Sequence, residues 1–311
     1  MKRIVAGATG LIGTELVNHW LRDGHTVIVI GRNKEKIKKQ FQGKVEALEW
    51  DELKPDNFKD AEVVVNLSGA GIADKRWSES RKKEILQSRI ITTNKIVSLL
   101  ISLGSDAPSL FNASAIGIYG LQPQIKNELP VKLDETFLID WDHAPDFLSQ
   151  VGREWEKATF PAKENGVRVV NMRFGVVLAK EGGALSKIVQ PFYFYLGGSI
   201  GTGNQPFSWI AIDDLLRAID FLIDKNDISG GINIVSPQCV TQRNLARTIG
   251  HVLHKPSFMQ TPYFMLKLMF GEMARELLLE GQHIYPKRLL ELKFQFKYPD
   301  VESALRHIYS L

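Results

Sequence analysis

The chain of 311 residues contains a single cysteine, Cys239, which excludes a disulfide within the chain and is typical of a reducing compartment. Long uncharged apolar runs are also missing. The most apolar late segment, 262–279, is interrupted by Lys267, Glu272, Arg275 and Glu276. Since a membrane span needs about 20 largely apolar residues, we expect a cytoplasmic protein without a membrane role, in which 262–279 forms packed helix.

An excess of one charge is missing as well. Thirty-nine Lys and Arg face 35 Asp and Glu, and the net charge of +4 comes without an aromatic–basic motif for reading nucleic acid. His251 and His254 have no further ligand types clustered near them, so we expect no metal site. These absences favour a small-molecule substrate or effector as the partner, rather than nucleic acid, and leave the oligomeric state open.

The first thirty residues predict a strand–helix–strand unit. An apolar run, 3–6, ends in glycine, an amphipathic helical pattern covers 14–21, and a second apolar run covers 26–30. Three glycines, Gly7, Gly10 and Gly13, fall where the first strand turns into the helix. Such a loop lets the backbone approach a pyrophosphate, which the helix N-terminus also attracts. The unit therefore predicts dinucleotide binding, with a plain tight turn as the alternative.

The end of the second strand selects the cofactor. Gly31 and Arg32 follow the apolar run, and no carboxylate stands there to bind the 2′-hydroxyl of NAD. Arg32 offers a planar, charged fork that suits the 2′-phosphate of NADP. We therefore expect NADP(H); the alternative is a solvated basic helix start, since the charge run 34–39 mostly faces water.

The rest of the chain alternates strand and helix patterns. Helical patterns at 78–104 and 146–164 separate apolar runs that are expected in strands: 45–51, 62–66, 109–114 and 167–173. Strands alternating with helices indicate a parallel sheet covered on both faces. We predict an α/β fold with a Rossmann-type doubly wound parallel sheet and a smaller α/β C-terminal domain that covers the substrate.

The three-glycine loop resembles that of short-chain dehydrogenases/reductases, and motifs along nearly the whole chain narrow this resemblance. They are Asn66-Leu-Ser-Gly-Ala-Gly, Arg76-Trp77, Ser88-Arg89-Ile90, Ala113-Ser-Ala-Ile-Gly-Ile-Tyr119-Gly120, Trp155-Glu156, Arg173-Phe-Gly-Val-Val-Leu178, Gly182-Gly-Ala-Leu185, Phe207-Ser-Trp209-Ile, Leu279-Glu-Gly-Gln282 and Phe294-Gln-Phe. The chain resembles an atypical extended member of the NAD-dependent epimerase/dehydratase group, in an epimerase-like subfamily of unassigned substrate with its own short C-terminal domain.

The resemblance implies two units. The NADP-binding Rossmann domain is expected over 1–178, with 208–230 returning to it, and a smaller substrate-covering domain over 179–207 and 231–311. Aromatic residues at 192–195 suit a small-molecule cleft or plain core. The glycine-rich loop, the end of the second strand and the resemblance together place the cofactor against Gly7, Thr9, Gly10, Leu11, Ile12, Gly13, Gly31, Arg32, Leu67, Ser68, Glu84, Arg89 and Ser149. A solvated helix face is the alternative for Glu84 and Arg89.

At the catalytic positions the chain departs from the superfamily that it resembles. The superfamily uses a Tyr-x-x-x-Lys pair, and the matching positions here are Leu148 and Gly152. Ser114 and Tyr119 are the substitute catalytic candidates; a small residue at a strand end and a packed aromatic are their structural alternatives. Losing a placed general acid/base costs about 10²–10⁴ in rate. Two hypotheses follow: an NADP-dependent oxidoreductase or epimerase-like enzyme with another proton donor, and a non-catalytic regulatory protein that senses NADP(H).

Overall fold

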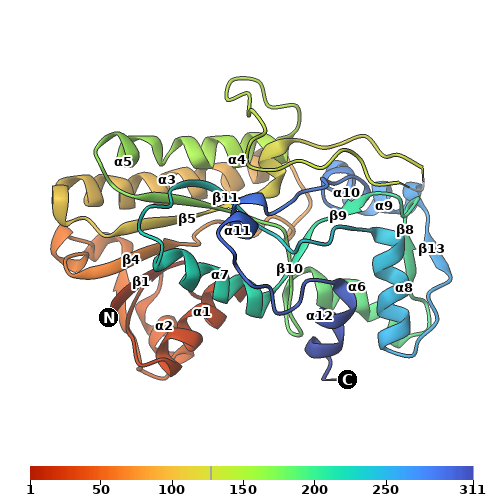
Figure 1. Cartoon of the computed structure of the whole chain (residues 1–311), viewed down its shortest axis with the longest axis horizontal. Coiled ribbons are helices and arrows are strands. Elements are labelled where there is room, and N and C mark those ends of the chain that lie inside the picture. The colour runs from red at the N-terminus through yellow and green to blue at the C-terminus, as the bar shows by residue number, and fades with distance from the viewer. Residues whose placement is uncertain (127, 311) are drawn as a thin grey trace.

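A computed structural model describes residues 1–126 and 128–310, so Leu311, the last residue of the predicted second unit, lies outside it. At its centre is a seven-stranded sheet in which every neighbouring pair is parallel (Figure 1). In sheet order the strands are β11 (Gly230–Ile234), β6 (Val169–Phe174), β5 (Ser109–Ala115), β4 (Ala61–Asn66), β1 (Lys2–Ala6), β2 (Thr26–Gly31) and β3 (Glu46–Glu49). The predicted Rossmann-type α/β fold is confirmed.

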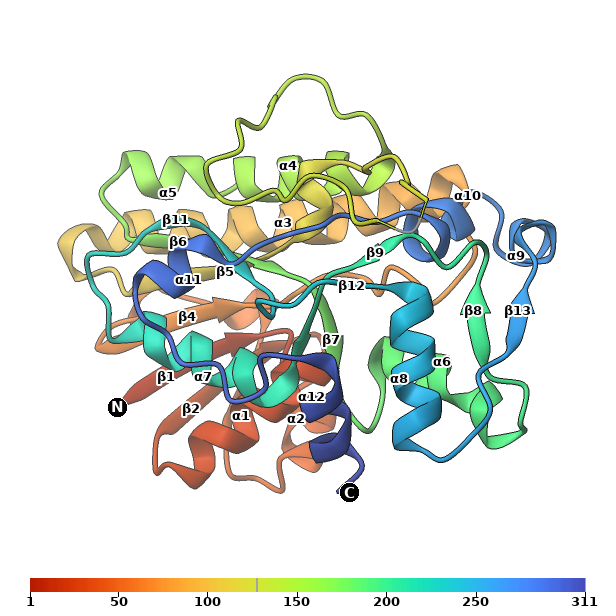
Figure 2. The same cartoon turned by 45° about the vertical axis from the view of Figure 1, so that its right-hand side comes forward.

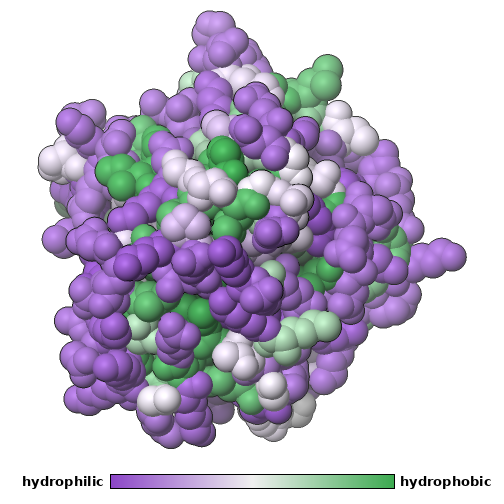
Figure 3. All heavy atoms as spheres, turned by 90° about the vertical axis from the view of Figure 1, so that its left-hand side faces the viewer, coloured by the Kyte–Doolittle hydropathy of each residue, from purple (hydrophilic) through white to green (hydrophobic). Residues whose placement is uncertain are grey.

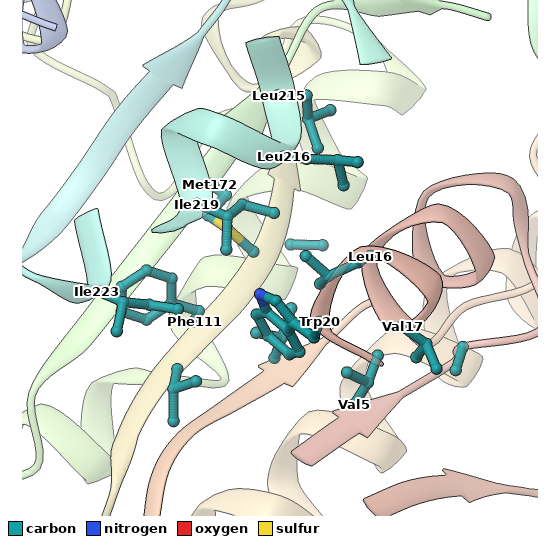
Figure 4. Close-up of a cluster of buried hydrophobic side chains, with 14 of the residues drawn as sticks. Val5, Leu16, Val17, Trp20, Phe111, Met172, Leu215, Leu216, Ile219 and Ile223 are labelled. Carbon is teal, nitrogen blue, oxygen red and sulfur yellow. The ribbon is translucent and has the colours of Figure 1, made fainter. Parts of the chain in front are cut away.

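Helices cover both faces of this sheet (Figure 1). One face carries α1 (Leu11–Arg22), α2 (Lys34–Gln40) and α7 (Ile212–Ile223), and the other carries α3 (Glu79–Leu103), α4 (Phe147–Lys157) and α5 (Phe160–Glu164). Figure 4 shows Trp20 of α1 among side chains of the sheet and of α7. Trp20 is fully buried, and its indole N–H donates to Asp220 at 2.7 Å. Because successive strand residues point to opposite faces, Val5 joins this core and Ile4 joins the core under α3.

The chain leaves the sheet after β6 and builds a second core. This part comprises β7 (Val176–Leu178), α6 (Gly183–Tyr193), β8 (Gly198–Ile200), β9 (Pro206–Phe207), β10 (Trp209–Ala211), β12 (Val240–Thr241), α8 (Gln242–Val252), β13 (Met259–Thr261), α9 (Tyr263–Phe270), α10 (Glu272–Ala274) and α12 (Val301–Ile308). Figure 2 shows α6, α8, β8 and β13 to one side of the sheet. The predicted unit boundary at residue 231 falls inside β11, which pairs along its length with β6.

Short helical turns complete the chain. They are the 3-10 turns at Trp50–Glu52, Pro55–Asn57, Gly104–Asp106 and Ile116–Tyr119, a π-helical turn at Arg275–Leu279, and α11 (Lys287–Glu291). Leu289 of α11 packs in the core under α7, so part of the late chain returns to the sheet. Thr241 caps α8 by accepting a hydrogen bond from the N–H of Asn244, as its place before the apolar pattern predicts.

The segment 262–279 corrects one expectation. It is helical, but α9 buries only Leu266, so the prediction of packed helix is wrong for α9. Tyr193, Phe194 and Tyr195 are exposed too, whereas Phe192 is buried. By contrast, the face on the left of Figure 1, shown in Figure 3, is mostly hydrophilic with small separate apolar areas. Within residues 1–126 and 128–310, no helix is long and apolar enough to cross a membrane.

Candidate functional site

A cleft of about 900 Å³ opens where β1, β2 and β4 end. Its walls come from five segments: the glycine-rich loop, the exit of β2 with the start of α2, Trp50 in the turn after β3, the loop after β4, and one face of α3. In parallel α/β sheets, ligands bind outside the carboxyl ends of the strands. The cleft is therefore the candidate binding site.

The glycines of the first loop have different tasks. Gly7 has a φ of +79°, and a Cβ there would lie 2.7 Å from the carbonyl of Leu67. A Cβ on Gly13 would lie 2.5 Å from the Cα of Ala8, so only glycine lets α1 begin so close to the loop. Gly10 lines the cleft, where a Cβ would have only the Gly7 carbonyl oxygen within 4 Å, at 3.7 Å, and no side chain caps α1 there. The first N–H groups of α1 thus stay available to an anion.

The exit of β2 forms a basic wall. Arg32 and Lys36 both line the cleft and are exposed. The neighbouring Lys34 is paired with Glu52 at 3.0 Å and does not line it. Asn33 caps α2 by accepting a hydrogen bond from the N–H of Lys36, which fixes the start of the helix beside the cleft. Two cations therefore face the cleft where a 2′-phosphate is expected.

The exit of β4 contributes a buried hydroxyl. Ser68 lines the cleft, is 7% exposed, and its Oγ has no hydrogen-bond partner among the described residues. Its backbone N–H donates to Asn66, whose amide donates in turn to Asn112 at 2.8 Å. Because buried polar atoms are nearly always paired, the Ser68 hydroxyl fits a ligand that brings the missing partner.

The face of α3 lines the opposite wall with polar side chains at helical spacing: Arg81, Glu84, Ser88 and Thr92. Ser88 accepts a hydrogen bond from the N–H of Ala70, which ties the loop after β4 to α3. The pKa of Glu84 is lowered, first by the hydrogen bond from Arg81. The sequence analysis did not single out Arg81, Ser88 and Thr92. Arg81 lies three residues before Glu84, and Ser88 and Thr92 lie four and eight residues after it. This helical spacing places all four side chains on one face of α3.

The cleft brings together most of the predicted cofactor residues. Those that line it are Gly7, Thr9, Gly10, Leu11, Gly31, Arg32, Leu67, Ser68 and Glu84. Ile12, Gly13, Arg89 and Ser149 are not among its lining residues. Ile12 packs against the core, and Gly13 lies beneath the loop.

Arg89 and Ser149 are engaged elsewhere. Arg89 lies behind the loop after β4, where it donates to the carbonyl of Ala70 and stacks over Trp155 at 4.8 Å. Burial lowers its pKa to about 10. Ser149 is fully buried, and its hydroxyl accepts from and donates to the backbone of Asp146 in the cap of α4. Their assignment to the cofactor remains a prediction.

The two catalytic candidates lie in a buried network rather than among the cleft-lining residues. Ser114 donates to Glu156 at 2.7 Å, and Arg173 donates to both oxygens of the same carboxylate. Arg173 also donates to the hydroxyl of Tyr119, which itself donates to Asn233 at 2.8 Å. Burial raises the pKa of Tyr119 to about 12. Both hydroxyls are thus already hydrogen-bonded within the protein.

The positions of the Tyr-x-x-x-Lys pair are packed against the 3-10 turn Ile116–Tyr119. A Cβ on Gly152 would lie 2.9 Å from the Cβ of Ile118, and Leu148 lies close to Gly117. The turn therefore occupies the space that a lysine at 152 would need. The pair is absent in sequence, and the turn leaves no room for a side chain at position 152.

Comparison with known proteins shows which family this chain resembles. A model described as the NAD dependent epimerase/dehydratase family matches residues 3–141, and a domain of unknown function (DUF1731) matches 261–308. The chain is 38% identical, over 98% of its length and 85% of the relative, to the chloroplastic epimerase family protein SDR39U1 homolog of Arabidopsis thaliana. It is 34% identical to the epimerase family protein YfhF of Bacillus subtilis, covering 99% and 98% of the two chains.

The chain belongs to the NAD-dependent epimerase/dehydratase family. A solved structure of a relative, human epimerase family protein SDR39U1 (isoform 2) with NADPH, matches it with a TM-score of 0.87 at 31% identity, covering 100% of this chain and 99% of that one. The predicted family is thereby confirmed, including its own short C-terminal domain, which the DUF1731 model matches over 261–308.

Proposed function

We propose that the protein binds NADP(H) in the cleft and acts as an epimerase-like oxidoreductase on a small molecule. The basic wall of Arg32 and Lys36 is the observation that carries the choice of NADP(H) over NAD(H). A relative of the same family was solved with NADPH, which supports the same choice.

The chain's own residues fit this cofactor. Gly10 leaves room for a pyrophosphate at the uncapped start of α1, and Ser68 offers a buried hydroxyl without a partner. When bound, the nicotinamide supplies hydride chemistry. The start of α6 packs on Leu11, a residue that lines the cleft, because a Cβ on Gly183 would lie 2.9 Å from the Leu11 side chain. We therefore expect the substrate to bind on the side of the cleft that faces the second unit.

Binding tests the cofactor assignment. Fluorescence titration should give a lower Kd for NADPH than for NADH, and Arg32→Asp should reverse the order by removing a cation and adding a carboxylate. Lys38→Asp is the matched control, because it makes the same charge change on α2 outside the cleft. Equal wild-type affinities for the two nucleotides would contradict the assignment.

A second candidate function is a non-catalytic NADP(H) sensor. The observation that favours it is the engagement of both Ser114 and Tyr119 in the buried network, together with the closed space at Gly152. NADPH oxidation against a broad panel of carbonyl compounds and nucleotide sugars separates the two. Turnover above the buffer rate supports the enzyme, whereas tight NADPH binding without turnover supports the sensor.

A further inference from the structure

Arg81 is a buried cation in the wall of the cleft. It is 7% exposed, yet it is among the residues that line the cleft. It belongs to the first turns of α3, beyond the loop that follows β4. Since charged side chains are rarely buried without partners, its hydrogen bonds show what it is positioned to do.

Two of its three nitrogens are engaged by the protein. Nη1 donates to Glu84 at 2.7 Å, and Nη2 donates to the carbonyl of Gly71. The carboxylate of Asp74 lies 3.7 Å from Nη2 and packs over Gly71. These contacts hold the guanidinium plane in one orientation and join α3 to the loop after β4.

The third nitrogen, Nε, is buried and has no hydrogen-bond partner among the described residues. Buried N–H groups are nearly always satisfied, and a fixed guanidinium binds phosphate oxygens with particular strength. Arg32 and Lys36 line the same cleft, so the cleft as a whole is suited to an anionic ligand. A phosphate oxygen of a ligand in this cleft would complete the bonding of Arg81.

We propose that Arg81 is a cofactor-binding residue whose Nε–H donates to a phosphate oxygen of bound NADP(H). This rests on the proposed function. Through its Nη groups the same side chain connects the ligand to Gly71 and Glu84. Arg81 thereby couples cofactor binding to the position of the loop after β4.

The test is a titration of NADPH and NADH against the full chain and its variants Arg81→Gln and Arg81→Lys. Both variants should weaken NADPH binding about tenfold to a hundredfold, because a hydrogen bond to a charged group is lost. In Arg81→Gln the dependence of Kd on salt should also become shallower, since one cation no longer meets the phosphate. Lys82→Gln is the matched control: its ammonium pairs with Glu272 outside the cleft.

Each outcome has a meaning. Loss for NADPH alone assigns the oxygen to the 2′-phosphate, and equal loss for both nucleotides assigns it to the shared diphosphate. An unchanged Kd in either variant, or a weaker Kd with the wild-type salt dependence in Arg81→Gln, would overturn the proposal. Arg81→Lys, which keeps the charge, carries the affinity test if Arg81→Gln does not fold. If the wild-type chain binds neither nucleotide, the proposed function fails instead.

Discussion

Arg173 shows how a single residue organises the region where catalysis is expected. It is 6% exposed and reaches Glu156 with Nε and Nη2 at 2.8 and 2.9 Å, while Nη1 reaches Tyr119. The carboxylate and its hydrogen bonds raise the pKa of Arg173, against the opposing effect of burial. Ser114 and Tyr119 therefore sit on either side of a closed ion pair.

Removing one member of that pair should be costly. We expect Arg173→Met to lower the free energy of unfolding by about 3–5 kcal/mol, because Glu156 would stay buried without its cation. Urea denaturation followed by circular dichroism measures this change. Arg306→Met is the control, since its pair with Glu302 is largely exposed, and it should cost less than about 1 kcal/mol. Similar losses in the two variants would contradict the role given to burial.

At the scale of elements, the N-terminal end of α4 is held by its own cap and by a residue of the second unit. Asp146 caps it by accepting a hydrogen bond from Ser149, and Glu276 accepts from the N–H groups of Phe147 and Leu148. Glu276 comes from the π-helical turn Arg275–Leu279, so a late segment reaches the helix that carries the lost catalytic positions.

Glu276 makes that contact sensitive to pH. Burial raises its pKa, against the hydrogen bond from Leu148, so the folded protein keeps this proton to a higher pH than the unfolded chain does. Between the pKa of Glu276 in the unfolded chain, about 4.3, and its raised pKa in the folded protein, unfolding releases a proton. The free energy of unfolding therefore falls as the pH rises through this range. Glu276→Gln removes the ionisation and should avoid this loss.

The measurement is the free energy of unfolding of both proteins between pH 4 and pH 7. The variant should gain on the wild type as the pH rises, and Glu79→Gln, on a side chain that is 94% exposed, is the control for the amide substitution itself. A difference between wild type and Glu276→Gln that does not change with pH would refute the prediction.

Elements and their contacts differ in how far the sequence predicts them. The glycine loop, the parallel strands and the cap at Thr241 follow from local patterns, and the structure has them in place. The closed space at Gly152 depends on Ile118, and the lone Nε of Arg81 depends on where the loop after β4 folds. Such contacts join segments distant in sequence, so no local pattern reports them.

At the scale of the whole molecule, the second unit exposes apolar side chains at one end. Tyr193, Phe194 and Tyr195 adjoin β8, which pairs with β13, and α9 follows directly. In Figure 2, α9 lies at the outer end beside β13 and β8. An apolar sequence pattern favours burial, but it does not show which other segment would cover the apolar residues. Only the fold shows that α9 lies at the surface.

Exposure of α9 leads to a direct test. Phe264 and Leu268 are 69% and 77% exposed, so Phe264→Ser with Leu268→Ser should change the free energy of unfolding by no more than about 0.5 kcal/mol for each substitution. The same double variant should bind less of the fluorescent dye ANS, which reports exposed apolar surface. Both quantities can be measured on one preparation.

The matched control is Leu266→Ser in the same helix. Leu266 is 6% exposed and packs with Ala274 and Leu279, so its loss should cost about 2–5 kcal/mol and should not lower ANS binding. If instead the double variant unfolds as readily as Leu266→Ser, then Phe264 and Leu268 are buried in solution. The apolar end of the second unit would then be covered, which would contradict the prediction that these side chains are exposed to solvent.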